Sequence, residues 1–254
     1  MKSDPMPLPD DFATTGFCAT RAGDTPITRF QVLGERSSGT NFVKRLLGRN
    51  SALKPVEVLG WKHGFTHMMA VPQDMGVICV VRDPLAWTLS MFDKPWHTTP
   101  QMQALPFSDF IRARWDTIID RPRYFDGLVP DGSTGAPLQM DRDPLTGQPF
   151  DTLFALRSAK LRSLLTLLDR DCTCVMLRME TAQADPEGTV TRLARTFGTA
   201  PAQNHRPVVK RLGSKFKPAI AHRPAKSATW SEADLNFARD QLDLTLESAL
   251  GYDP

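Results

Sequence analysis

Residues 28–49 read TRFQVLGERSSGTNFVKRLLGR, and the pattern of this stretch indicates the fold class. Its first seven residues are typical of a strand that ends at Gly34, and apolar residues follow at helical spacing from Thr40 onward. A polar turn that ends in Gly39 lies between them. A strand, a glycine-bounded turn and a helix, in that order, are typical of the first unit of an α/β domain.

Strands and helices continue to alternate along the chain. Hydrophobic spacing predicts further strands over 56–61, 76–82 and 172–178, and helices over 40–49, 84–92, 107–120, 152–169, 186–197 and 231–250. Such alternation implies right-handed crossovers between parallel strands. We therefore expect a single three-layer, P-loop-type α/β domain over residues 26–254, with a mostly parallel central sheet flanked by helices.

Two segments lack this periodicity. Residues 1–25 carry three prolines before Asp10 and are predicted to form an extended or disordered arm. Residues 121–150 are rich in proline, glycine and aspartate, and a loop of that length is usually functional or disordered. A mobile lid and an inert insertion both remain open for this second segment.

Composition excludes several classes of protein. The 254 residues carry 31 basic and 28 acidic side chains, a balance that argues against a nucleic-acid binder. Four cysteines are too few for a disulfide scaffold, and the pair Cys172 and Cys174 has no companion ligands for a metal site. No apolar stretch reaches 18 residues, so we expect no transmembrane segment and a cytoplasmic protein. Oligomeric state leaves no mark that one sequence reveals.

The first polar turn has the G-x-x-x-x-G-T frame of a phosphate loop, from Gly34 to Thr40. Backbone N–H groups at the start of the helix form an anion nest, and the hydroxyls of Ser37, Ser38 and Thr40 add donors for phosphate oxygens. The lysine that reaches the outer phosphates in an ATPase or GTPase is missing. The alternative is that one of the two serines simply caps the helix.

The second turn follows the most hydrophobic strand and reads Arg82-Asp83-Pro84, with Ser90 eight residues after the arginine. A helix that starts at Pro84 brings the hydroxyl of Ser90 about two turns along, where it and Arg82 can hold one phosphate. The alternative is an arginine paired with Asp83 and a serine that faces solvent.

Together these turns resemble the sulfotransferase family, through the core Ser38-Gly39-Thr40 and the element Arg82-x-Pro84 with Ser90. The resemblance implies the donor 3′-phosphoadenosine 5′-phosphosulfate (PAPS), the product adenosine 3′,5′-bisphosphate (PAP) and no metal. It implies donor contacts from Arg36, Ser37, Ser38, Gly39, Thr40 and Asn41 to the 5′ end, from Arg82 and Ser90 to the 3′ phosphate, and from Phe42 to adenine.

The resemblance extends to Trp61-Lys62-His63-Gly64, where members of the family carry a lysine and a histidine near the transferred sulfonate. A hydroxyl acceptor needs a base to take its proton, and His63 is the candidate for this role. The leaving phosphate needs a cation to stabilise its charge. Lys62 and Arg36 are the candidate cations. Many members place a basic residue directly before the S-G-T core, where this chain has Ser37.

The sequence thus predicts a PAPS-dependent sulfotransferase that acts on a hydroxyl or amine of a small molecule or glycan. One alternative is a P-loop nucleotide or small-molecule kinase that requires ATP and magnesium. Another is a nucleotide-binding module without turnover. The basic run 210–217 is a candidate second clamp on the 3′ phosphate or a solvated loop.

Overall fold

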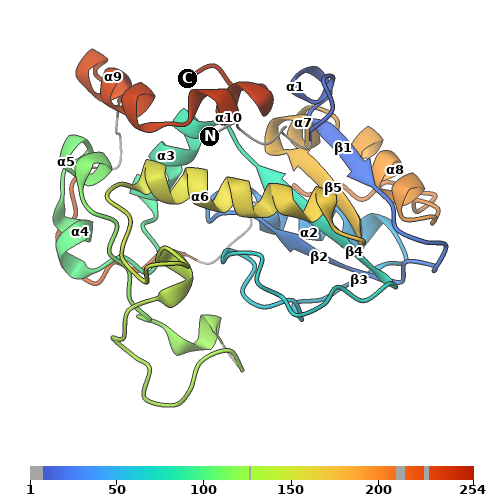
Figure 1. The fold of residues 1–254 in the computed structure, drawn as a ribbon, viewed down its shortest axis with the longest axis horizontal. Coiled ribbons are helices and arrows are strands. Elements are labelled where there is room, and N and C mark those ends of the chain that lie inside the picture. The colour runs from blue at the N-terminus through green and yellow to red at the C-terminus, as the bar shows by residue number, and fades with distance from the viewer. Residues whose placement is uncertain (1–7, 126, 210–214, 226–228) are drawn as a thin grey trace.

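The computed structural model describes residues 8–125, 127–209, 215–225 and 229–254 (Figure 1). Five strands form one sheet in the order β1-β5-β4-β2-β3. β1 runs antiparallel to β5, and the other neighbouring pairs are parallel. The strands are β1 (Phe17–Thr20), β2 (Arg29–Leu33), β3 (Lys54–Pro55), β4 (Met75–Val81) and β5 (Thr173–Arg178). The predicted α/β class with a mostly parallel sheet is confirmed.

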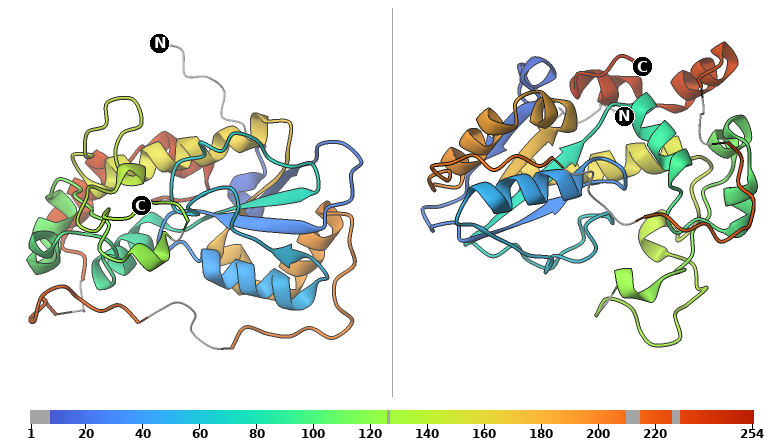
Figure 2. Two further views of the ribbon diagram at one scale, coloured as in Figure 1. Left: turned by 90° about the horizontal axis from the view of Figure 1, so that it is seen from below. Right: turned by 180° about the vertical axis from the view of Figure 1, so that it is seen from behind.

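Helices cover both faces of this sheet, and Figure 2 shows the sheet between α6 on one side and α2 on the other. The α-helices are α1 (Phe12–Thr15), α2 (Thr40–Asn50), α3 (Pro84–Asp93), α4 (Pro100–Ala104), α5 (Phe107–Arg112), α6 (Leu153–Leu165), α7 (Met179–Ala184), α8 (Pro186–Thr196), α9 (Glu232–Gln241) and α10 (Leu244–Ala249). Short 3₁₀ turns are η1 (Pro122–Tyr124), η2 (Gln139–Asp141) and η3 (Thr166–Asp169).

Strand β4 shows why helices are needed on both faces. All seven of its residues are buried. Val77 and Cys79 pack with leucines of α6, whereas Ile78 and Val80 pack with side chains of α2 and α8. Successive side chains of a strand point to opposite faces, so a wholly apolar strand requires an apolar layer on each side. The three-layer arrangement follows directly from this composition.

Helices α3, α4, α5 and α9 lie to one side of the sheet (Figure 1). A separate aromatic core joins them to the first half of α6. Its fully buried members include Trp87, Phe110 and Phe154. This cluster fixes α3, the helix that carries Ser90, against the start of α6.

The N-terminal prediction is corrected by the structure. Residues 1–7 lie outside the described residues, but Phe12 is fully buried and residues 17–20 form β1. Cys18 pairs with Met176 in an antiparallel register along the edge of β5. The short run Phe17–Thr20 has too few residues for a visible period, so the sequence alone predicted an extended or disordered arm.

The strand predicted over 56–61 is also corrected. Pairing with β2 is limited to Lys54 and Pro55, and one further bond runs from Val56 N to Phe30 O at 2.9 Å. Beyond it the buried amide of Gln31 accepts from the N–H groups of Val58 and Leu59, each at 2.8 Å. A side chain thus replaces the ladder, and Trp61-Lys62-His63 lies in a loop rather than at the end of a strand.

Two predicted helices are shorter than expected. Helix α5 ends at Arg112, because Trp115, Thr117 and Ile119 are buried alternately and the β-branched residues among them favour an extended chain. The helix predicted over 231–250 is broken into α9 and α10.

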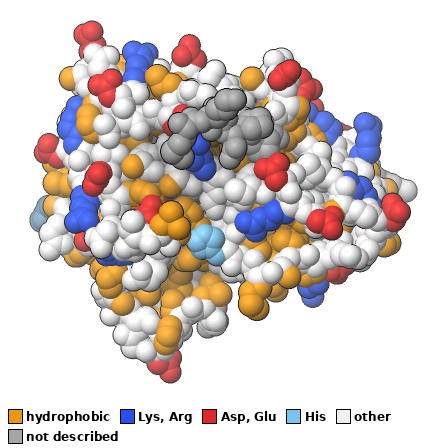
Figure 3. Space-filling model, in the orientation of Figure 1, with side chains coloured by type: hydrophobic (Ala, Val, Ile, Leu, Met, Phe, Trp, Pro, Cys, Tyr) orange, Lys and Arg blue, Asp and Glu red, His pale blue; other side chains and the backbone are white. Residues whose placement is uncertain are grey.

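Charged side chains of both signs are interspersed on the face shown in Figure 3. Among the described residues, no helix combines the length and apolar character that crossing a membrane requires.

Candidate functional site

A cleft of about 760 Å³ lies beyond the carboxyl ends of β2 and β4, where Gly34 and Arg82 follow their strands. The predicted residues in its lining come from all three turns: Arg36, Ser37, Gly39, Thr40, Asn41, Phe42, Lys62, His63, Arg82 and Ser90. Ser38 is the predicted residue that does not contribute to the lining. The three sequence elements therefore meet at one place. The first two follow parallel strands that end at the same edge of the sheet, and Lys62 and His63 reach this edge from a loop.

The first turn is closed by its own hydrogen bonds. Ser38 is buried, and its hydroxyl donates to the carbonyl of Glu35 at 2.6 Å. The N-cap of α2 is Gly39, with no side-chain cap bond, so neither serine caps the helix and that alternative is wrong. Ser37 (φ 64°) and Gly39 (φ 97°) both adopt left-handed conformations. Left-handed residues in a turn are compatible with a backbone nest, in which successive N–H groups point to one anion.

The backbone N–H groups of this nest are free to bind an anion. Within the described part of the chain, no protein group accepts a hydrogen bond from the N–H groups of Ser37, Gly39, Thr40 and Asn41. The first N–H groups of a helix have no partner inside it, and α2 is 11 residues long. Its dipole adds a partial positive charge at this end. The turn can therefore hold a phosphate without a lysine.

Gly39 is a position where this turn tolerates no side chain. A Cβ atom there would lie 2.2 Å from Sδ of Met179, on a backbone at φ 97°. We expect Gly39→Ala to lower the free energy of unfolding by about 2 kcal/mol. Gly48→Ala on the same helix is the matched control, because its Cβ would meet Pro55 at an ordinary 3.5 Å. It should stabilise the protein by about 0.5–1 kcal/mol; equal effects in chemical unfolding would contradict the strained geometry.

Arg82 joins the second turn to the first. Its Nη1 donates to the carbonyl of Ser37 and to the hydroxyl of Ser90, both at 2.9 Å. Asp83 does not pair with it, because the Asp83 carboxylate caps α3 by accepting from Ala86 N at 2.8 Å. Burial lowers the pKa of Arg82, although Glu180 and Asp83 oppose this shift. The guanidinium and hydroxyl predicted to share one phosphate are thus in contact and line the cleft.

His63 is held in one tautomer. Its Nδ1 lies 2.6 Å from the carbonyl oxygen of Gly34. A carbonyl only accepts, so Nδ1 carries the proton and Nε2 keeps its lone pair. Burial, followed by the positive charge of Lys62, holds the pKa of His63 well below the usual 6.5. The ring is therefore neutral at neutral pH and presents a proton acceptor.

Lys62 lies beside the start of α2. Its Nζ donates to Oδ1 of Asn41 at 2.8 Å and is 3.7 Å from a carboxylate oxygen of Glu57. Burial lowers the pKa of Lys62, and Glu57 opposes the shift. Only 16% of the side chain is exposed, so the ammonium is poorly hydrated and ready to contact an anion at the nest.

The guanidinium of Arg36 does not point freely into the cleft, as a catalytic cation would. Although it borders the cleft, its side chain is only 3% exposed and its guanidinium is engaged by protein groups. It donates to Glu35 at 3.1 Å, to Asp141 at 2.5 Å and to the carbonyl of Trp96 at 2.8 Å. Burial opposes its charge, yet Asp141 and Glu35 outweigh burial and raise the pKa of Arg36.

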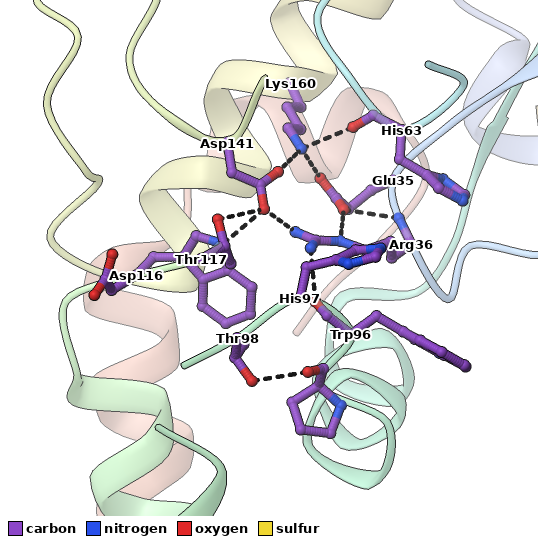
Figure 4. A network of polar contacts seen from close by, with 12 residues as sticks. Glu35, Arg36, His63, Trp96, His97, Thr98, Asp116, Thr117, Asp141 and Lys160 are labelled. Carbon is purple, nitrogen blue, oxygen red and sulfur yellow. Dashed lines mark hydrogen bonds and ion pairs between the residues drawn. The ribbon is translucent and has the colours of Figure 1, made fainter. Parts of the chain in front are cut away.

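Lys160 completes a buried cluster of two cations and two carboxylates with Glu35, Arg36 and Asp141 (Figure 4). Its Nζ is 2.5 Å from Asp141 and 2.9 Å from Glu35. It also donates to the carbonyl of His63 at 2.7 Å. The cluster has no net charge, and it ties the first turn, the His63 loop, α6 and the 121–150 segment to one another.

Sequence reasoning missed this cluster and a second histidine. Lys160 stands between Leu156 and Leu164 at helical spacing, and a lysine within an apolar stripe was the available signal. His97 also lines the cleft and lies 2.6 Å from a carboxylate oxygen of Asp120. Its sequence neighbourhood contains no motif that marks it.

Comparison of the chain with known proteins found no match among protein-family models, curated proteins or solved structures.

Proposed function

We propose that the chain is a cytoplasmic, PAPS-dependent sulfotransferase with a P-loop-type fold. The observation that carries this proposal is the contact between Arg82 and Ser90 at 2.9 Å, in the same cleft as the anion nest, Lys62 and His63. A 3′-phosphorylated nucleotide needs two separate anion sites, one for each end of its ribose. The nest and the Arg82–Ser90 pair are the two sites that we propose for these phosphates.

The donor would bind with its 5′ phosphate at the start of α2 and its 3′ phosphate at Arg82. Phe42 lines the cleft next to the nest and packs against the core that contains Met179. A half-buried aromatic ring beside two phosphate sites is suited to stacking on adenine. The phosphates and the base of the donor would thus bind in one cleft.

The transfer itself can be written with the residues present. The acceptor oxygen or nitrogen forms a bond to sulfur while the bond from sulfur to the 5′-phosphate oxygen breaks and leaves its electron pair on the phosphate. The proton of the acceptor passes to Nε2 of His63. The developing charge on the phosphate is stabilised by the nest and by Lys62, which replaces Arg36 in this role.

The engagement of Arg36 also bears on the kinase alternative. A kinase built on this turn would need a cation for the outer phosphates in place of the missing lysine, and Arg36 is the basic residue within the turn. Its guanidinium is already bound to Glu35 and Asp141 inside the protein. Arg36 therefore does not supply that cation, which weakens the kinase alternative. A binding module without turnover would keep the same donor contacts and differ only in the absence of transfer.

Calorimetric titration of PAP tests the donor site directly. We expect magnesium-independent binding that Arg82→Ala weakens by about tenfold to a hundredfold, because a charged hydrogen bond to phosphate is lost. Arg239→Ala is the control, since Arg239 lies on α9 and donates to the carbonyl of Pro254. Binding of ATP with magnesium and no binding of PAP would favour the kinase, and the absence of both would reject a nucleotide site.

A further inference from the structure

His97 lines the same cleft as His63, and the donor site and the base leave it without a role. It lies in the loop between α3 and α4 with a backbone φ of 67°. A histidine in the left-handed region persists where surrounding contacts fix it, and such residues cluster at functional sites. The left-handed backbone of His97 therefore makes this residue a candidate for a functional role.

Several contacts fix this loop. The carbonyl of His97 accepts from Ile118 N at 2.8 Å, and the preceding carbonyl of Trp96 accepts from Arg36 Nη1 at 2.8 Å. The ring packs against aromatic neighbours, with centroid distances of 4.9 Å to Phe125 and 5.9 Å to Trp61. The imidazole is thus held in place before any ligand binds.

Asp120 sets the proton on the ring. Its carboxylate oxygen lies 2.6 Å from Nδ1 of His97, and a carboxylate only accepts. Nδ1 therefore carries a proton, and Nε2 is the nitrogen left for the cleft. Burial lowers the pKa of His97, although the contact with Asp120 opposes the shift. The neutral ring presents a lone pair on Nε2.

The cleft thus contains two neutral imidazoles that flank one indole. The ring centroids of His63 and His97 lie 5.5 Å and 5.9 Å from that of Trp61. In each ring Nδ1 is tied to a protein oxygen, so each offers Nε2 as a hydrogen-bond acceptor. One hydroxyl group has one proton and satisfies one of these nitrogens. Two acceptors in one cleft therefore match a ligand with two donors.

We propose that Nε2 of His97 accepts a hydrogen bond from a second hydroxyl of the acceptor, so that the acceptor is a polyhydroxylated molecule such as a sugar. This inference rests on the proposed sulfotransferase function. His63 takes the proton of the hydroxyl that receives the sulfonate, and His97 holds a neighbouring hydroxyl. Asp120 is a positioning residue, because it acts by keeping the ring of His97 in this tautomer.

Transfer from radiolabelled PAPS to a panel of probes tests the inference. The polyols are methyl β-D-glucopyranoside, myo-inositol and glycerol, and cyclohexanol is the single-hydroxyl probe. We expect transfer to at least one polyol, with a KM that rises about tenfold or more in His97→Asn and in Asp120→Asn. His67→Asn is the matched control, because His67 is exposed and stacks on Phe65. Its KM should equal that of the wild type.

PAP binding and transfer distinguish an error in the role of His97 from an error in the proposed sulfotransferase function. PAP binding with transfer to cyclohexanol alone, or with polyol KM values unchanged in His97→Asn, overturns the role of His97 and leaves the sulfotransferase standing. The absence of both PAP binding and transfer overturns both.

A second measurement avoids dependence on the folding of the variants. Wild-type protein with ¹⁵N-labelled histidine, saturated with PAP, should show a shift of the His97 Nε2 resonance when the accepted polyol is added. An unchanged Nε2 resonance would show that the residue has only a structural role.

Discussion

Replacing Asp141 with Asn should lower the free energy of unfolding by about 3–5 kcal/mol, because it leaves buried cations without their counter-charge. The Asp141 side chain is 1% exposed and accepts from Arg36 and Lys160, each at 2.5 Å. It also accepts from the hydroxyl of Thr117 at 3.0 Å. Without its charge, Glu35 alone would face two buried cations. Urea unfolding followed by circular dichroism measures the change.

Asp116→Asn is the control, since its side chain is 48% exposed and lies 3.7 Å from Arg142. An exposed pair of this kind contributes about 0–1 kcal/mol. The double variant Asp141→Asn/Lys160→Gln removes one charge of each sign, so it should lose less stability than the sum of the two single variants. A loss below about 1 kcal/mol in Asp141→Asn would show that the cluster is not a stabilising ion network.

The same cluster predicts that the stability of the folded protein decreases in acidic solution. Burial tends to raise the pKa of Asp141, but Arg36 and Lys160 outweigh it and hold that pKa below the ordinary 3.8. Because the folded pKa lies below the unfolded one, the stabilisation is present above pH 3.8 and is lost as the pH falls further. The acid unfolding curve of Asp141→Asn should lack this contribution, so the curves of variant and wild type should converge at low pH.

Anchoring by Asp141 also changes the interpretation of the 121–150 segment. The sequence left a mobile lid and an inert insertion open. In the structure, Phe125 and Leu138 pack into a small core with Ile119, and Asp141 is bound to the first turn through Arg36. Any closure over the cleft would therefore involve the exposed stretches between these anchors. The lid itself stays a prediction.

The parts of the fold that the sequence predicted are those with a local cause. Strand β4 is a continuous apolar run, Ser231 caps α9 through its side chain, and Pro84 starts α3. Each of these signals lies within a few residues of the element that it determines. The site turns were predictable for the same reason, because a glycine-bounded turn after a strand has a recognisable spacing.

The parts that the sequence did not predict depend on pairs that are distant along the chain. Arg36 and Asp141 are 105 residues apart, and His97 and Asp120 are 23 apart. No spacing rule connects such positions, so the sequence could not show that the charge of Arg36 is neutralised inside the protein. It also could not show that Gln31 ends the pairing of β3 by binding the next N–H groups itself.

Replacing His63 with Asn should reduce the rate of sulfonate transfer by about 10²–10⁴-fold, which is the usual contribution of a positioned general base. The Asn amide can still donate to the carbonyl of Gly34, so the loop and the affinity for PAP should change little. PAP release from PAPS, with methyl β-D-glucopyranoside or water as acceptor, measures the rate. His67→Asn again serves as the control on the surface.

The pH profile separates a base from a residue that only shapes the cleft. Burial first, and then Lys62, hold the pKa of His63 well below 6.5, so the wild-type rate should persist below pH 6.5 and fall only in more acidic solution. Lys62→Met removes the second cause and should move this fall to higher pH, while burial keeps it below 6.5. The comparison between wild type and Lys62→Met uses the pH at which the rate falls, because loss of Lys62 also lowers the maximal rate. An unshifted profile, together with an unchanged rate in His63→Asn, would assign the proton transfer to another group.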